Sequence, residues 1–123
     1  MERFGNLKNY FESTSDGYKL HEAYINSFDE EVRNSFLTGA QQNVVVAYIG
    51  LSPYYTDHFT QQKQDAYETL YKRKAAVVEK YGYHVVRPRF GAEDYVDPLH
   101  LSTLGGYKLA LVVSNKIKSQ EFR

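Results

Sequence analysis

The chain has 123 residues, of which 42% are hydrophobic and 24% are charged, a composition typical of one soluble globular domain with a modest core. Its 15 basic and 15 acidic side chains cancel, so no excess of positive charge favours nucleic acid or an anionic membrane as a partner. The absence of cysteine excludes disulfides, thiolate catalysis and zinc–thiolate sites.

The first third of the chain, residues 1–42, is predicted to be mainly helical. Apolar residues at helical spacing occur over residues 4–11 and again over residues 18–25, with a turn between them. A capping-box pattern that starts at Ser27 predicts a further helix, with Ser27 as its N-cap and Gly39 as its C-terminal stop.

The remainder, residues 43–118, is predicted to form a strand–helix–strand unit, a loop and a last helix. The continuous apolar run 44–51 suits a strand covered on both faces, and residues 83–87 form the second strand. A helix predicted over residues 60–81 separates them, so the two strands should be parallel, with a right-handed crossover. The last helix is expected over residues 103–118. We therefore predict a single α/β domain, with helices flanking a small parallel sheet.

Two parallel strands that are buried on both faces do not make a stable sheet by themselves. Three explanations are open: a third strand lies in the N-terminal third, the strands pair with another chain, or the chain is part of a larger fold. An apolar edge such as residues 44–51 should not be left bare. We therefore expect a homo-oligomer or an association with a complementary chain.

A candidate site follows from the positions of Asp97 and His100. Ligands of open α/β sheets bind beyond the carboxyl ends of the strands, where the loops after both predicted strands emerge. A carboxylate three residues before an imidazole suits an Asp that orients a His, and a His that takes a proton from a hydroxyl nucleophile. Candidate substrate-binding residues lie in or just before the other loop, predicted over residues 54–59: Ser52, Tyr54, Tyr55 and His58.

Structural roles are open for several of these residues. The Asp-x-x-His pattern is also explained by local hydrogen bonding before a helix, with Asp97, Ser102 or Thr103 as the cap. Two arginines around Pro88 either hold an anionic substrate or form ion pairs with acidic residues of the next loop: Arg87 and Arg89, with Glu93 and Asp94. The four histidines show no metal-ligand spacing and no glycine-rich phosphate loop is present, so we predict neither a metal site nor a cofactor.

Three segments resemble the C-terminal end of SGNH (GDSL-type) hydrolases: residues 83–87, Asp97-Pro98-Leu99-His100-Leu101-Ser102 and Gly106-Tyr107-Lys108-Leu109-Ala110. In that family an Asp-x-x-His block completes a Ser-His-Asp triad, and a helix that opens with a Gly-aromatic pair follows it. The resemblance covers about residues 44–117. It implies a partial flavodoxin-like, three-layer architecture, with Asp97 as the orienter and His100 as the general base.

The chain also departs from this family's pattern. No Gly-Asp-Ser nucleophile turn occurs, and the place of the Gly-x-Asn-Asp oxyanion block reads Gly50-Leu51-Ser52-Pro53, without an Asn. We therefore expect the C-terminal half of such a domain, cut off before its first strands or degenerated. One hypothesis is esterase or acyl-transfer chemistry on an O-acylated small molecule or carbohydrate, with the serine supplied by another chain or missing. The alternative is a non-catalytic binding or self-assembly module.

The expected location follows from what the sequence lacks. No stretch approaches the length of a transmembrane helix, and residues 1–5 do not resemble a signal peptide. We therefore expect a cytoplasmic protein without a membrane or nucleic-acid partner.

Overall fold

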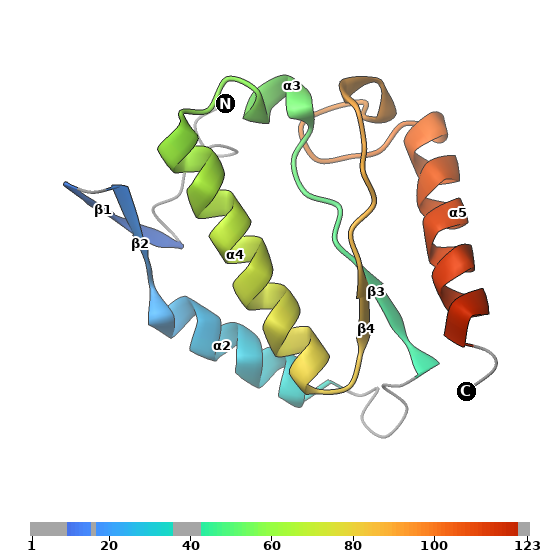
Figure 1. The fold of residues 1–123 in the computed structure, drawn as a ribbon, viewed down its shortest axis with the longest axis horizontal. Helices are drawn as coiled ribbons and strands as arrows, with labels where there is room; N and C mark the ends of the chain where they lie inside the picture. The colour runs from blue at the N-terminus through green and yellow to red at the C-terminus, as the bar shows by residue number, and fades with distance from the viewer. Residues whose placement is uncertain (1–9, 16, 36–42, 121–123) are drawn as a thin grey trace.

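The computed structural model describes residues 10–15, 17–35 and 43–120, and arranges them as two small sheets with four α-helices (Figure 1). In chain order the elements are β1 (Phe11–Thr14), β2 (Gly17–Leu20), α2 (Glu22–Arg33), β3 (Val45–Ala47), α3 (Pro53–Thr56), α4 (Gln61–Lys80), β4 (His84–Val86), the 3₁₀ helix η2 (Ala92–Asp94) and α5 (Thr103–Gln120). The protein therefore has the mixed α/β character that the sequence predicts.

An antiparallel hairpin occupies part of the region predicted as helical. Strands β1 and β2 pair with Phe11 opposite Leu20 and Thr14 opposite Gly17. Gly17 has a φ of +129°, which glycine adopts without steric cost, at the start of β2. The helical predictions for Phe11 and for residues 18–20 are therefore wrong, because pairing across the turn outweighs the local spacing. Tyr10 lies in a turn, and residues 4–9 of the first predicted helix lie outside the described residues.

Helix α2 begins before the predicted capping box. Its N-cap is His21, whose backbone N–H donates to the Tyr10 carbonyl at 2.8 Å and whose side chain makes no capping bond. Ser27 lies inside the helix, so its prediction as N-cap is wrong. A helix that starts at Glu22 includes the buried Ile25, whose burial stabilises the folded state by about 1.5–3 kcal/mol. This exceeds the roughly 1 kcal/mol that a side-chain cap contributes to stability. The predicted stop at Gly39 lies outside the described residues.

The predicted strand–helix–strand unit is confirmed. Strands β3 and β4 are parallel, with Val45 opposite His84. Helix α4 connects them, and the hydroxyl of Thr60 accepts the Lys63 N–H at 3.2 Å as its N-cap. Each strand has three residues, fewer than predicted. Gly50, with a φ of +75°, lies where the chain turns away after β3 and thereby shortens the predicted run.

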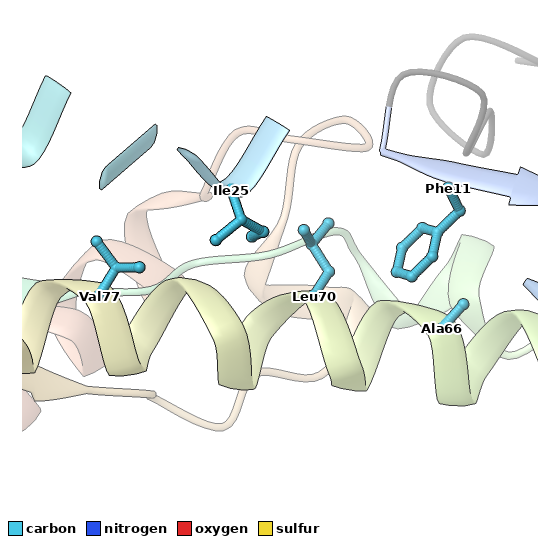
Figure 2. Packing of buried hydrophobic residues seen from close by; sticks show 5 residues of the cluster. All are labelled: Phe11, Ile25, Ala66, Leu70 and Val77. Carbon is cyan, nitrogen blue, oxygen red and sulfur yellow. The ribbon is translucent and has the colours of Figure 1, made fainter. Parts of the chain in front are cut away.

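The helices cover the two sides of the β3–β4 pair. Figure 1 shows α4 on one side of this pair and α5 on the other, and both helices contact β4. A buried hydrophobic cluster joins α4 to the hairpin and to α2 (Figure 2): Phe11, Ile25, Ala66, Leu70 and Val77. The buried apolar face of α4 therefore packs against the N-terminal third of the chain.

One edge of β3 is open. The Val44 carbonyl accepts a hydrogen bond from β4, and the Tyr48 N–H donates one to β4, so the even-numbered residues face that strand. The backbone groups of Val45 and Ala47 point to the opposite edge, where no strand runs within the part of the chain that the structure describes. The hairpin forms a separate sheet. Pairing with another chain and a larger fold stay predictions.

Helix α5 begins against the fully buried side chain of Asp94. Lys108 Nζ and the Gly91 N–H donate to its Oδ2 at 2.9 and 2.8 Å. Burial disfavours the charged form, but these two hydrogen bonds hold the pKa of this carboxyl below its ordinary value. Ser102 Oγ caps the helix by accepting the Gly105 N–H at 3.2 Å, and the Ser102 N–H donates to the Asp94 carbonyl at 2.7 Å. These contacts pack the first turn of α5 on η2.

A Cβ at Gly105 would lie 2.1 Å from the backbone oxygen of Asp94. We therefore expect Gly105→Ala to lower the free energy of unfolding by about 1–3 kcal/mol, the usual cost of overpacking. Gly106→Ala is the matched control, because nothing lies within 4 Å of its Cβ and alanine favours a helix by about 1 kcal/mol. Urea denaturation measures both variants. Equal stabilities would contradict the close packing of α5 on Asp94.

Candidate functional site

The side chains of Asp97 and His100 form a hydrogen-bonded pair. His100 Nδ1 lies 2.8 Å from Asp97 Oδ2 and 2.9 Å from Oδ1. An ionised carboxylate only accepts hydrogen bonds, so Nδ1 carries the proton and Nε2 of the neutral imidazole is left as an acceptor. The His100 side chain is 74% exposed, which leaves its imidazole accessible to solvent.

The Asp97 carboxylate also fixes the backbone of its own loop. Its Oδ1 accepts the N–H groups of Leu99 and His100 at 2.8 and 2.7 Å. These hydrogen bonds, that of Leu99 first, hold the pKa of Asp97 below its ordinary value, although partial removal of water acts in the opposite direction. Asp97 is therefore ionised at neutral pH. Ser102, rather than Asp97 or Thr103, caps α5.

The loop that carries the pair is anchored at two points. The Val96 N–H donates to the His100 carbonyl at 2.8 Å and closes the loop on itself. The Ser52 N–H donates to the Pro98 carbonyl at 3.0 Å and ties the loop to the segment after β3. The Asp97–His100 pair therefore stands on a backbone that is fixed from both sides, as preorganised catalytic groups require.

The predicted substrate-binding residues belong to α3 and its flanks rather than to a loop, because Pro53 occupies the first turn and Ser52 is the N-cap. Ser52 is 2% exposed, and its Oγ accepts the Tyr54 N–H at 3.2 Å. The Tyr54 ring is 64% exposed and meets the rings of Tyr55 and His58 edge-on. The loop prediction is therefore wrong for residues 54–56, whereas residues 57–59 form a turn and a bend as predicted, and the Ser52 hydroxyl is engaged in capping.

A cavity of about 290 Å³ opens at the carboxyl ends of β3 and β4, where open α/β sheets bind their ligands. Its walls come from residues 48–51 and 87–90, directly after the two strands, and from α3 and α4. Two of the residues singled out from the sequence, Arg87 and Arg89, line it. The candidate catalytic and substrate-binding residues do not: Asp97, His100, Ser52, Tyr54, Tyr55 and His58. The Asp97–His100 pair and the cavity are therefore separate features.

The ion pairs around the cavity differ from those expected. Arg87 Nη1 contacts Glu68 of α4, with distances of 2.9 and 2.7 Å to its two carboxylate oxygens. Glu93 and Asp94 lie instead near Lys108 Nζ, at 4.0 and 2.9 Å. The predicted pairing of the arginines with these two acids is therefore wrong. Helix α4 runs beside β4 and brings Glu68 to Arg87, whereas η2 packs against α5.

Two charged side chains of the cavity, Arg89 and Asp57, make no hydrogen bond or ion pair with the residues that the structure describes. Tyrosines form much of the apolar wall, and burial raises the pKa of Tyr67 to about 12. Asp57 lies in the loop predicted beside the site, but sequence reasoning gave it no binding role, and it missed Tyr67. The available signal for Asp57 was position alone, since it follows the first strand of the parallel pair.

The described residues hold no metal site that would indicate a function, and the comparisons with known proteins identify no relative. The described residues contain no group of three or more His, Asp or Glu side chains placed to hold a metal ion. Among the helices of residues 10–15, 17–35 and 43–120, none is both long and apolar enough to cross a bilayer. No family model, curated protein or solved structure matches the chain. Function is therefore inferred from the local chemistry.

We expect the Asp97 carboxyl to titrate below the usual aspartate value of about 3.9. The stabilisation that it gives the loop is complete above that usual value and is lost as the pH falls through the lowered folded-state pKa. NMR titration of the Leu99 and His100 amide protons measures the midpoint. Asp97→Asn is the control, since it keeps a carbonyl acceptor and removes the titration. A midpoint at or above the usual value would contradict the two amide hydrogen bonds.

Proposed function

We propose that Asp97 and His100 form the acid–base half of an SGNH-type site for ester hydrolysis or acyl transfer. The observation that carries this proposal is the 2.8 Å contact between His100 Nδ1 and Asp97 Oδ2 on an exposed imidazole. In a Ser-His-Asp triad the carboxylate contacts Nδ1 and orients the ring, so that Nε2 takes the proton of the nucleophile. No described residue occupies Nε2 of His100.

The proposed reaction transfers an acyl group from an O-acylated small molecule or carbohydrate. As a serine Oγ attacks the ester carbonyl, His100 takes the hydroxyl proton and then passes it to the leaving alcohol. Asp97 stabilises the imidazolium that forms between these steps. The partial flavodoxin-like architecture belongs to the same proposal, and the parallel β3–β4 pair with α4 and α5 on its two sides supports it (Figure 1).

The serine of this reaction is proposed to come from another chain or to have been lost. Ser52 is tied to the Asp97–His100 loop through Pro98, but it is buried and its Oγ caps α3. Ser102 Oγ donates to the Glu93 carbonyl and caps α5. Both hydroxyls therefore cap the N-termini of helices, and neither contacts His100.

Hydrolysis of p-nitrophenyl acetate tests the proposed base. General-base catalysis contributes about 10²–10⁴ in rate. In the complete site, with the serine supplied by another chain, we therefore expect His100→Ala to lower the rate by at least about 100-fold. His21→Ala is the matched control, because His21 lies at the start of α2 and its side chain makes no capping bond. Wild type and His100→Ala hydrolysing the ester at equal rates would refute the catalytic role.

A self-assembly module is the second candidate, and the open edge of β3 favours it. The edge consists of uncharged, apolar residues and has none of the lysines or prolines that protect strand edges from pairing. Three large apolar side chains are also exposed on one face of α5: Leu104, Tyr107 and Leu111, at 48%, 65% and 48%. A net charge of zero gives two copies no reason to repel each other. We propose that a second copy pairs at the β3 edge.

Light scattering tests this pairing. We expect the wild type to be a dimer or larger, and Ala47→Pro to be monomeric, because the N–H that proline removes faces the open edge. Val46→Pro is the contrasting variant. It removes a donor that faces β4 and should lower the free energy of unfolding, as urea denaturation will show. A monomeric wild type, or an unchanged mass for Ala47→Pro, would exclude the β3 edge as the interface.

A further inference from the structure

The cavity beyond β3 and β4 carries charges that the acyl-transfer proposal does not use. Of its charged lining residues, Arg87 and Glu68 neutralise each other through contacts of 2.7 and 2.9 Å. Arg89 and Asp57 are both exposed, and their side chains make no hydrogen bond or ion pair within the described chain, although the charge of Arg89 also acts on Glu68. The lining therefore presents one cation and one anion to a ligand, which together have no net charge.

The two arginines are placed to act on one group. They lie two positions apart on the segment that follows β4, with the buried Pro88 between them, and both line the cavity. Both contacts of Arg87 with Glu68 use Nη1, so Nη2 and Nε remain as donors. The Arg87 guanidinium carbon lies 4.0 Å from the ring centroid of Tyr71, and this stacking holds the side chain in place. Planar donors of this kind match the oxygens of a carboxylate or a phosphate, and the small volume of the cavity favours the smaller carboxylate.

We propose that this cavity binds a small zwitterion, a molecule with a carboxylate and an ammonium group on one carbon, as in an α-amino acid. Its carboxylate pairs with Arg89 and the remaining donors of Arg87, and its ammonium group pairs with Asp57. A purely anionic ligand would leave Asp57 opposed to it, and a purely cationic ligand would leave Arg89 opposed to it. Only a ligand with both charges is complementary to the whole lining.

The walls and the volume define the rest of the ligand. Aromatic rings of Tyr67, Phe90 and Tyr95 line the cavity, and they favour an apolar or aromatic side chain. The volume of about 290 Å³ lies at the lower end of the range of about 300–1,000 Å³ usual for ligand pockets, so the ligand is compact. This proposal does not rest on Asp97 and His100.

Titration of the full, ¹⁵N-labelled chain with three probes tests the proposal. The probes are L-phenylalanine, N-acetyl-L-phenylalanine, which lacks the ammonium group, and L-phenylalanine amide, which lacks the carboxylate. Binding is followed at the backbone amides of Gly50 and Phe90, which line the cavity. We expect the dissociation constant of L-phenylalanine to be at least about tenfold lower than that of either analogue, because each analogue loses one charge-assisted contact.

Two variants assign the contacts. Arg89→Gln should reduce the preference for L-phenylalanine over its amide, because only the donors of Arg87 then remain for the carboxylate. Asp57→Asn should remove the preference over the N-acetyl analogue. Arg33→Gln and Glu31→Gln are the charge-matched controls, since both residues are exposed on α2, outside the cavity lining. They should leave all three dissociation constants unchanged. Equal affinities for the three probes, or no shift of either amide at millimolar concentration, would overturn the proposal.

Discussion

The burial of one face of α4 is the interaction on which the rest of the structure depends. This helix of 20 residues contributes Ala66, Leu70 and Val77 to the hydrophobic cluster, which is completed by Phe11 of the hairpin and Ile25 of α2 (Figure 2). Each large apolar side chain buried in this way contributes about 1.5–3 kcal/mol. The hairpin and the β3–β4 pair belong to separate sheets, so α4 is what holds the two sheets in one unit.

The same helix contributes residues both to the hydrophobic cluster and to the lining of the cavity. Glu68 follows Ala66 by two positions, and in an α-helix two positions rotate a side chain by about 200°. When Ala66 packs into the cluster, Glu68 is therefore turned toward β4, where it pairs with Arg87. The exposed contact between Arg73 and Glu22 contributes little, because solvent screens it. Apolar packing, rather than surface charge, thus determines where the cavity's paired charges lie.

Sequence separation explains which features the sequence alone predicts. The Asp97–His100 contact spans three residues, and a local turn is sufficient to form it. Helix α4 is long and periodic, so its position follows from its own residues. The pairing of Phe11 with Leu20 also depends on a turn, which a helical spacing over the same short segment conceals. The contact between Arg87 and Glu68 spans 19 residues and exists only because α4 packs beside β4, so no local pattern predicts it.

The imidazole of His100 is the part of the candidate site that the backbone hydrogen bonds of the loop do not explain. The Asp97 carboxylate accepts two backbone N–H groups, and this alone is sufficient reason for an aspartate at the start of the loop. The N–H of position 100 would be available from almost any residue, because it belongs to the backbone. A side chain that is 74% exposed buries little apolar area and adds little packing energy. What histidine adds at this position is a hydrogen bond to the Asp97 carboxylate and an exposed side chain whose Nε2 no described residue contacts.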